Sequence, residues 1–320
     1  MNPRSILVKV PASVGNFAGA MNSAALTLDA WFNAKVTPRV DGRVGVRYFG
    51  ENGDRIPRDR SNLIVRAMEA ALHLKGLEFS GADFEVYSSV PVGAGMGSST
   101  AAVLAGLIAA DRLYSLGLDE KTLFELALIY EPRRDNLHAA WHGGFVACPG
   151  EQHQVLRRTF VPGDFVLGVV TPELESVSSV ANCGASTGTA DKDLSFDTDR
   201  ALALADLFAR HGGGTPLGLE PALSSEFRKT VPGLEEALKV SADGVMGIFV
   251  CGFGPGVGIL SRQNPDQAIR DVQQCFRGKG VPSTYGLFRP TNAGARELNA
   301  VTPHITLPAL RLAGASASAS

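Results

Sequence analysis

A glycine-rich turn, residues 91–100 with the sequence PVGAGMGSST, restricts the fold of this chain more strongly than any other segment. The preceding residues 84–90 alternate in polarity as a strand does, and residues 101–115 predict a helix. Glycines at alternate positions leave backbone N–H groups uncovered, and three hydroxyl residues follow where the helix begins. Because a helix N-terminus has unpaired N–H groups and partial positive charge, the segment predicts a phosphate-binding turn.

Two other glycine-loop motifs do not fit this turn. No lysine follows its last glycine, which excludes the Gly-x-x-x-x-Gly-Lys-Ser/Thr loop. Gly93, Gly95 and Gly97 are evenly spaced, whereas the dinucleotide-binding fingerprint is Gly-x-Gly-x-x-Gly. A flexible turn that simply precedes a helix remains the structural alternative to a phosphate site.

Composition and charge exclude several classes of protein. Glycine is more frequent than its usual share of about 7%, since it makes up 36 of the 320 residues. The glycines do not recur at every third residue, which excludes collagen. The 45% share of hydrophobic residues excludes disorder throughout the chain. Lys and Arg number 30 against 32 Asp and Glu, with no basic block. Binding to nucleic acid or to an anionic membrane through bulk charge is therefore excluded.

The two longest uncharged stretches do not predict a membrane protein. Residues 86–110 and 244–261 are both interrupted by Gly, Ser or Pro, and neither offers about 20 consecutive apolar residues. The four cysteines are far apart and form no Cys-x-x-Cys pair, and the N-terminus shows no secretory signal. These features predict a cytoplasmic protein with reduced thiols.

The rest of the chain mixes both kinds of secondary structure, and its length suggests about two domains. Strands are expected at 5–10 (ending at Pro11), 24–29, 31–38, 44–49, 84–90 and 165–171, with two more strands in 244–260. Helices are expected at 62–75, 101–115, 121–130, a segment ending at Gly143-Gly144, 195–210, 225–240 and 265–277.

A second group of polar residues follows the helix expected at 121–130. Glu131, Asp135 and Asn136 could hold Mg²⁺, which prefers hard oxygen ligands, and could orient a hydroxyl group. The structural alternative is a helix junction with Asp135 as the N-cap. His138 and His142 lie four residues apart on one helix face, but without a third ligand a packed pair is favoured over a zinc site.

Several blocks of the sequence resemble the GHMP small-molecule kinases. These blocks are Pro11-Ala-Ser-Val-Gly-Asn16, the turn 91–100 and residues 131–144. Three later blocks, 226–233, 251–255 and 292–296, are most similar to the homoserine kinase branch of that superfamily. The resemblance extends over nearly the whole chain, from about Val8 to Leu298.

The resemblance implies a two-domain α+β fold. Residues 1–155 would form an N-terminal ATP-binding domain of the ribosomal protein S5 domain 2-like type. Residues 156–312 would form a C-terminal ferredoxin-like α/β sandwich, and 313–320 a low-complexity tail.

The implied activity is the ATP-dependent phosphorylation of the hydroxyl of L-homoserine to O-phospho-L-homoserine, a step of threonine biosynthesis, with ATP and Mg²⁺ as cofactors. The implied partner is a small-molecule substrate, with no nucleic acid and no membrane, and a homodimer is left open. Two alternatives remain. One is a GHMP kinase for another hydroxylated metabolite, threonine-like or mevalonate-like, and the other is a non-catalytic nucleotide-binding homologue.

The resemblance also assigns roles to individual residues. Asn62 would contact adenine, and Ser99 and Glu131 would bind Mg²⁺. The triphosphate loop would comprise Pro91, Gly93, Ala94, Gly95, Met96, Gly97, Ser98, Ser99 and Thr100. The substrate pocket would include Asn16, Asn22, Arg133, Ser178 and Arg228. Arg228 would grip a carboxylate and act with Asp135 and Asn136 in catalysis, where Asp135 is either a base or, as we favour, an orienting group.

Three departures from the family pattern fall on the acceptor side. Asn22 replaces the carboxylate that receives the substrate amine in the family. Arg133 stands at the position of the family's histidine, and Asn182 replaces a second carboxylate-binding arginine. Losing a charged partner for a charged substrate typically costs several kcal/mol. Either Arg133 or Arg134 therefore compensates, or the acceptor is not homoserine.

Overall fold

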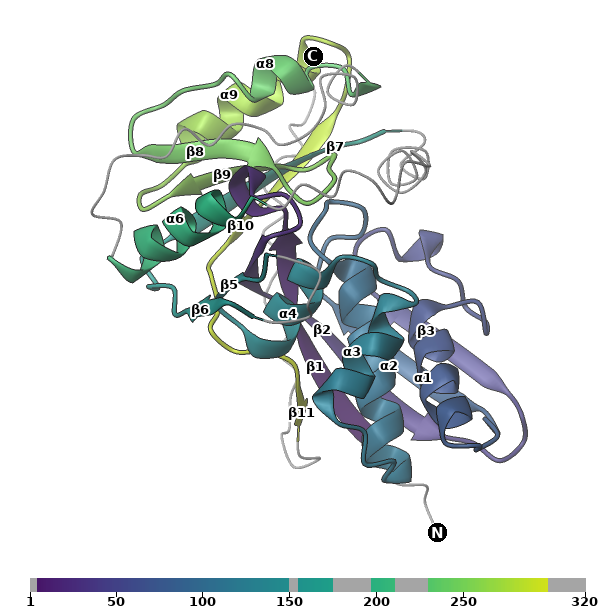
Figure 1. Cartoon of the computed structure of the whole chain (residues 1–320). Coiled ribbons are helices and arrows are strands. Elements are labelled where there is room, and N and C mark those ends of the chain that lie inside the picture. The colour runs from purple at the N-terminus through teal and green to yellow at the C-terminus, as the bar shows by residue number, and fades with distance from the viewer. Residues whose placement is uncertain (1–4, 150–154, 175–196, 211–229, 299–320) are drawn as a thin grey trace, which may run out of the picture.

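The computed structural model describes residues 5–149, 155–174, 197–210 and 230–298. It contains two β-sheets, each covered by helices, in two halves of the molecule (Figure 1). The expected mixed α+β fold is confirmed. Within the described ranges no helix is long and apolar enough to cross a membrane.

The larger sheet lies in the N-terminal half, and its strands follow the order β11-β1-β2-β4-β3, with β5 on β2 and β6 on β5. Among the described strands of this sheet, only β3 and β4 pair in parallel. The bounds are β1 Ile6–Gly15, β2 Ala24–Pro38, β3 Val44–Phe49, β4 Ala82–Ser88, β5 Phe145–Ala147, β6 Arg157–Thr159 and β11 Arg296–Leu298.

Strand β1 corrects one of the sequence predictions. The strand expected to end at Pro11 continues to Gly15. The register against β2 shifts at this point, since Pro11 lies opposite Trp31 and Ala12 opposite Leu28. A proline has no N–H to donate, and such an irregularity in the ladder accommodates it. The two pieces expected at 24–29 and 31–38 accordingly form one continuous strand, β2.

Helices α1, α2, α3 and α4 pack together over one face of this sheet (Figure 1). Their bounds are α1 Leu63–Leu74, α2 Ser98–Tyr114, α3 Glu120–Leu128 and α4 Arg134–His142. Helix α2 is central and buried over most of its surface, as expected for a helix that is apolar all round. A Cβ at Gly106 would lie 2.2 Å from the Ile64 carbonyl oxygen, so α1 and α2 approach too closely for a larger residue.

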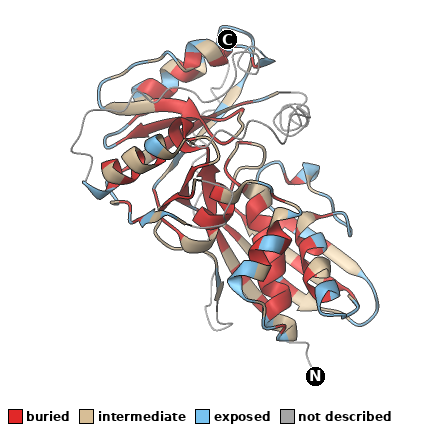
Figure 2. Cartoon of the chain, viewed as in Figure 1, coloured by how far each residue is buried: buried red, intermediate tan, exposed pale blue. Residues whose placement is uncertain are grey.

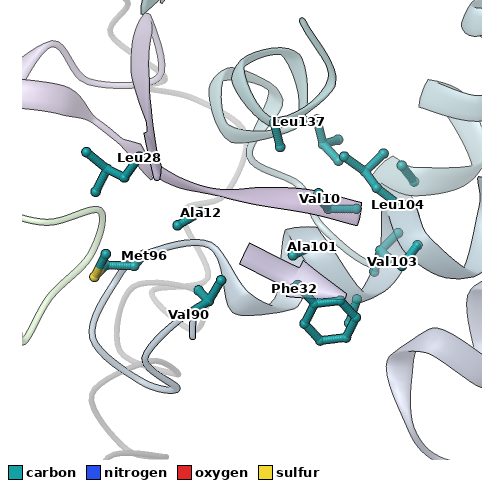
Figure 3. Close-up of a cluster of buried hydrophobic side chains, with 14 of the residues drawn as sticks. Val10, Ala12, Leu28, Phe32, Val90, Met96, Ala101, Val103, Leu104 and Leu137 are labelled. Carbon is teal, nitrogen blue, oxygen red and sulfur yellow. The ribbon is translucent and has the colours of Figure 1, made fainter. Parts of the chain in front are cut away.

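The core between the sheet and α2 holds the glycine turn in place. Val10 and Phe32 of the sheet, Met96 of the turn and Leu104 of α2 are all buried there (Figure 3). Burying one such side chain contributes roughly 1.5–3 kcal/mol. Figure 2 shows buried residues on helices and strands in both halves of the molecule. The N-terminus of α2 is therefore fixed relative to β1.

The second sheet is antiparallel, with the order β10-β7-β9-β8. Its strands are β7 Val166–Pro172, β8 Val245–Val250, β9 Val257–Ser261 and β10 Ser283–Phe288. Helices α8 (Leu234–Ala237) and α9 (Asp266–Arg277) share a core with one face of it. In chain order the strands run 4-1-3-2, which is the arrangement expected of a ferredoxin-like sandwich.

The two halves meet in a continuous apolar core. Phe17, in the short 3₁₀ helix η1 (Phe17–Gly19), lies 4.8 Å from Phe249 of β8 between ring centroids. It also lies 6.0 Å from Phe208 of α6 (Thr198–Ala209). The loop after β1 is thus packed directly against the second sheet.

Three differences from the sequence predictions remain. The helix expected at 225–240 is not continuous in its described part, because the chain turns at Val231–Gly233 before the short α8, and Gly233 has φ +88. Strands β5, β6, β10 and β11 were not predicted. Strand β11 joins the first sheet although it lies beyond residue 156. The domain division at 155 and 156 stays a prediction.

Candidate active site

The glycine turn lies between β4 and α2, and two of its own side chains are buried in the core. Ala94 and Met96 are 0% and 1% exposed, so these two predicted loop residues point into the core. Gly95 has φ +76, and a Cβ there would lie 2.0 Å from the Cys251 carbonyl oxygen. Gly97, with φ +74, is the N-cap of α2. The backbone of the turn and the residues that open α2 are therefore the groups available to a ligand.

The first turn of α2 is joined to Glu131 by hydrogen bonds. Ser99 donates its hydroxyl to Glu131 Oε2 at 2.6 Å, and Thr100 donates to the same oxygen at 2.9 Å. Glu131 itself is only 3% exposed. The structure thus brings together the two residues predicted to bind Mg²⁺, which lie 32 positions apart in the chain.

Arg133 is the closest cation to this pair among the described residues. Its Nε donates to Glu131 Oε1 at 2.7 Å and its Nη2 to Oε2 at 2.9 Å. The same Nη2 lies 3.3 Å from the Ser99 hydroxyl. Its guanidinium also lies 5.8 Å from the Phe253 ring. The arginine therefore binds both predicted metal ligands.

The electrostatics of this ion pair keep both groups charged. Burial alone would raise the pKa of Glu131, but the charge of Arg133 and the hydrogen bonds from Arg133, Ser99 and Thr100 outweigh it, so this pKa lies below its ordinary value. Burial would lower the pKa of Arg133, yet the Glu131 carboxylate raises it overall. An ion pair in such surroundings is strongly coupled, because removing either partner leaves a buried charge.

The donor set suits Mg²⁺ bound together with phosphate. A serine hydroxyl and a carboxylate are hard oxygen ligands, and they already lie side by side at the N-terminus of α2. The described residues contain no group of three or more His, Cys, Asp or Glu that could hold a metal alone. Phosphate oxygens and water would therefore have to complete the coordination, as is usual for Mg²⁺.

A second buried group surrounds Asp135, which is 1% exposed. The Asn16 N–H donates to Asp135 Oδ2 at 2.6 Å, and the Asn136 N–H donates to Oδ1 at 2.8 Å. Helix α4 begins at Arg134 with Arg133 as its N-cap, so the alternative of Asp135 as N-cap is wrong. Asn136 is 0% exposed, and neither its Oδ1 nor its Nδ2 has a hydrogen-bond partner within the structure. An orphaned amide of this kind is costly unless a ligand or water satisfies it.

The loop after β1 closes this group from the other side. The Asn22 N–H donates to Asn16 Oδ1 at 2.8 Å, and Asn16 Nδ2 donates to the Gly252 carbonyl at 3.5 Å. The turn between β8 and β9, which contains Gly252 and Phe253, thus forms a wall of the site. This turn lies in the block 251–255 that resembles the homoserine kinases, but the resemblance assigned it no role in the site.

The remaining predicted residues are placed as follows. Asn62 is the N-cap of α1, where its side chain accepts from the Ile64 N–H at 3.1 Å and donates to the Pro57 carbonyl at 2.7 Å. Arg228 and Ser178 lie outside the described residues. The rings of His138 and His142 stack nearly parallel, with centroids 5.8 Å apart, which fits the packed pair that was favoured.

The environment of Asp135 predicts a pH dependence of stability. Burial raises the pKa of this carboxyl above 3.8, and the N–H groups of Asn16 and Asn136 and the Arg133 charge only partly offset that effect. A raised pKa in the folded state means that stability is full below pH 3.8 and is lost as the pH rises through the folded pKa. Asp135→Asn should therefore gain stability relative to the wild type as the pH increases from about 4 to 7.

Urea unfolding of both proteins across this pH range measures the difference. A constant offset would reflect only the hydrogen bond that asparagine cannot accept, and it would contradict the titration. Asp119→Asn is the control, because hydrogen bonds from Thr122 lower the pKa of Asp119. Its stability difference should stay nearly constant from pH 4 to 7, because a lowered pKa changes stability only as the pH falls below 3.8.

Comparison with known proteins relates this chain to a group of kinases. Residues 62–144 match the family model of the GHMP kinases N terminal domain. A homoserine kinase from Solibacter usitatus is 28% identical over 280 residues, covering 86% of this chain and 91% of its own. A homoserine kinase from Persephonella marina is 25% identical over 292 residues, covering 90% and 96%.

Solved structures share the fold over almost the entire chain. The homoserine kinase of Cytophaga hutchinsonii superposes with a TM-score of 0.71 at 21% identity, covering 92% of this chain and 97% of its own. The galactokinase of Lactococcus lactis gives a TM-score of 0.64 at 15% identity, covering 93% and 96%. Residues 62–144 therefore form a GHMP kinases N terminal domain, and nearly the whole chain is similar in sequence to homoserine kinases and in fold to a homoserine kinase and a galactokinase.

Proposed function

We propose that this protein transfers the γ-phosphoryl group of ATP to the hydroxyl of L-homoserine, giving O-phospho-L-homoserine, with Mg²⁺ as the metal. The observation that carries the proposal is the Ser99–Glu131 pair, a hydroxyl and a carboxylate 2.6 Å apart at the N-terminus of α2. Relatives named homoserine kinase, matched over 86% and 90% of the chain, support this choice of acceptor.

Phosphoryl transfer depends mainly on charge stabilisation and in-line positioning. In the proposed reaction the N–H groups of the glycine turn and of the first turn of α2 bind the phosphate chain. When bound at Ser99 and Glu131, Mg²⁺ would neutralise part of the charge on the β- and γ-phosphates. Asn62 is proposed to lie near the adenine, with its side chain holding the start of α1.

The acceptor is proposed to bind on the side of Asn16 and Asn136. The orphaned amide of Asn136 offers a hydrogen bond to the acceptor hydroxyl. Both oxygens of Asp135 already accept backbone N–H groups, which favours a role in holding Asn16 and Asn136 in place over a role as base. Ser178 and Arg228 remain proposed contacts of the substrate.

An acceptor panel tests the proposed function directly. ADP release by the purified protein would be measured with homoserine, threonine and mevalonate, each with Mg²⁺ and with a chelator. We expect Mg²⁺-dependent turnover that is fastest with homoserine. Turnover only with another acceptor would replace homoserine as the substrate. No turnover with any acceptor, despite nucleotide binding, would favour the non-catalytic homologue.

Asn22→Asp tests whether the acceptor amine binds at this position. Asn22 has φ +50, a conformation that aspartate also tolerates, so the change restores the family's carboxylate without new strain. We expect the KM for homoserine to fall roughly 10- to 100-fold, because a hydrogen bond to a charged group contributes about 1.5–3 kcal/mol. Asn52→Asp is the matched control, since exposed Asn52 has φ +54. An equal effect in both variants would place the amine elsewhere.

A further inference from the structure

The guanidinium of Arg133 lies where a metal cation would be expected, against both proposed Mg²⁺ ligands. Glu131 Oε1 accepts from Arg133 Nε at 2.7 Å and from the Arg133 backbone N–H at 3.4 Å. Glu131 Oε2 accepts from Arg133 Nη2 at 2.9 Å as well as from Ser99 and Thr100. Every oxygen of the carboxylate therefore already binds at least two donors.

Ser99 is engaged in the same way. Its hydroxyl donates to Glu131, and its oxygen lies 3.3 Å from Arg133 Nη2. Magnesium needs free lone pairs at about 2.0–2.1 Å in nearly octahedral geometry. The guanidinium and a divalent cation thus require the same lone pairs of Glu131 and Ser99. Both cannot occupy these positions together.

Displacing Arg133 has an electrostatic cost that a bare metal ion does not offset. The arginine side chain is 17% exposed and Glu131 is 3% exposed, so the separated guanidinium would be left as a mostly buried charge. Removing one partner from a buried ion pair is strongly destabilising. A nucleoside polyphosphate brings negative charge together with the metal, so it can compensate the released guanidinium.

We propose that Arg133 is a tethered counter-ion that competes with the divalent cation for Glu131 and Ser99, so that the metal binds only together with nucleotide phosphate. This rests on the proposed function only in assigning the metal to Ser99 and Glu131. The released guanidinium stays close to the site, because Arg133 is the N-cap of α4 and its Nη1 already lies against the turn at Gly252. Arg133 is thus a positioning residue that sets the order of metal and nucleotide binding.

Mn²⁺ binding, followed by the electron paramagnetic resonance signal of the free ion, tests the proposal without turnover. We expect the wild type to bind Mn²⁺ at least 10-fold more tightly with ADP than without it. Arg133→Gln should bind Mn²⁺ without ADP at least 10-fold more tightly than the wild type does. Arg134→Gln is the control, with the same loss of charge one residue away, and should behave like the wild type.

A second variant provides a test of the proposal even if Arg133→Gln does not fold. Arg133→Lys keeps the charge but cannot span both carboxylate oxygens and Ser99, so its Mn²⁺ affinity without ADP should lie between those of the wild type and Arg133→Gln. Unchanged Mn²⁺ affinity in both Arg133 variants would overturn the proposal. So would a wild type that binds ADP equally tightly with Mn²⁺ and with a chelator, since Arg133 would then replace the metal permanently.

The same titrations separate this proposal from the proposed function. Tighter Mn²⁺ binding by Arg133→Gln in the absence of ADP supports the competition whatever the acceptor is. Failure of all acceptors in the ADP-release assay, with this Mn²⁺ result intact, would refute the kinase reaction and leave the counter-ion role standing.

Discussion

Glu131→Gln is expected to lower kcat by at least 100-fold and to reduce the free energy of unfolding by about 3 kcal/mol. The loss of activity follows from removing the carboxylate proposed to bind the metal. The loss of stability follows from the buried Arg133 guanidinium, which would keep its charge but lose its partner. Steady-state kinetics and urea unfolding measure the two effects on the same preparation.

A double variant separates the two effects. Glu131→Gln with Arg133→Gln removes both charges, so most of the lost stability should return while activity stays low, because replacing both partners of a buried pair is often nearly neutral. Glu125→Gln is the control, since Glu125 is exposed on α3 and pairs only with Lys121 among the described residues. Full activity in Glu131→Gln would exclude the metal role of this residue.

Gly95→Ala is expected to have the second largest effect of the proposed variants. It should lower the free energy of unfolding by roughly 2–5 kcal/mol and should also abolish nucleotide binding. A left-handed conformation costs an alanine about 1–2 kcal/mol, and overpacking typically adds 1–3 kcal/mol. Here the added Cβ would lie 2.0 Å from the Cys251 carbonyl oxygen, so the turn would have to move away from the second sheet. Urea unfolding and calorimetric titration with ADP measure both losses.

Gly76→Ala is the control that separates the cost of the close contact with Cys251 from the cost of the left-handed conformation. Gly76 has φ +68, similar to φ +76 at Gly95, but no atom lies within 4 Å of its added Cβ. It should therefore lose only about 1–2 kcal/mol and keep its affinity for ADP. If the two variants lost equal stability and Gly95→Ala still bound ADP, the packing of the turn against Cys251 would be unimportant.

Local patterns were enough to predict most of the N-terminal half. The helical spacing of apolar residues in 62–75 and the glycine turn before 101–115 correspond closely to α1 and α2. The strands that were missed lack such patterns. Strand β11 has only three residues, and β10 has no fully buried residue. Pairing with distant strands, rather than an apolar face of their own, determines both.

The candidate site shows the same division between local and distant information. The glycine turn and the cluster at Glu131 could be identified separately, and the family resemblance suggested that Ser99 and Glu131 work together. Which oxygens Arg133 binds could not be predicted, because its sequence neighbours say nothing about Ser99, 34 residues away. The role of the Gly252 turn was missed for the same reason, since it reaches Asn16 from 236 residues away.

The pairing of β11 with β1 has a consequence for how the protein is made. Strand β1 begins at Ile6, and its partner Leu298 faces Leu7 across the sheet. The segment leading into β11 also binds β2, where the Asp29 N–H donates to the Arg289 carbonyl and Thr27 bonds to Thr291. During translation this edge of β1 stays unpaired until residues 296–298 have left the ribosome, and an unpaired edge can recruit other strands. Synthesis of the C-terminal segment therefore completes the sheet that holds the glycine turn.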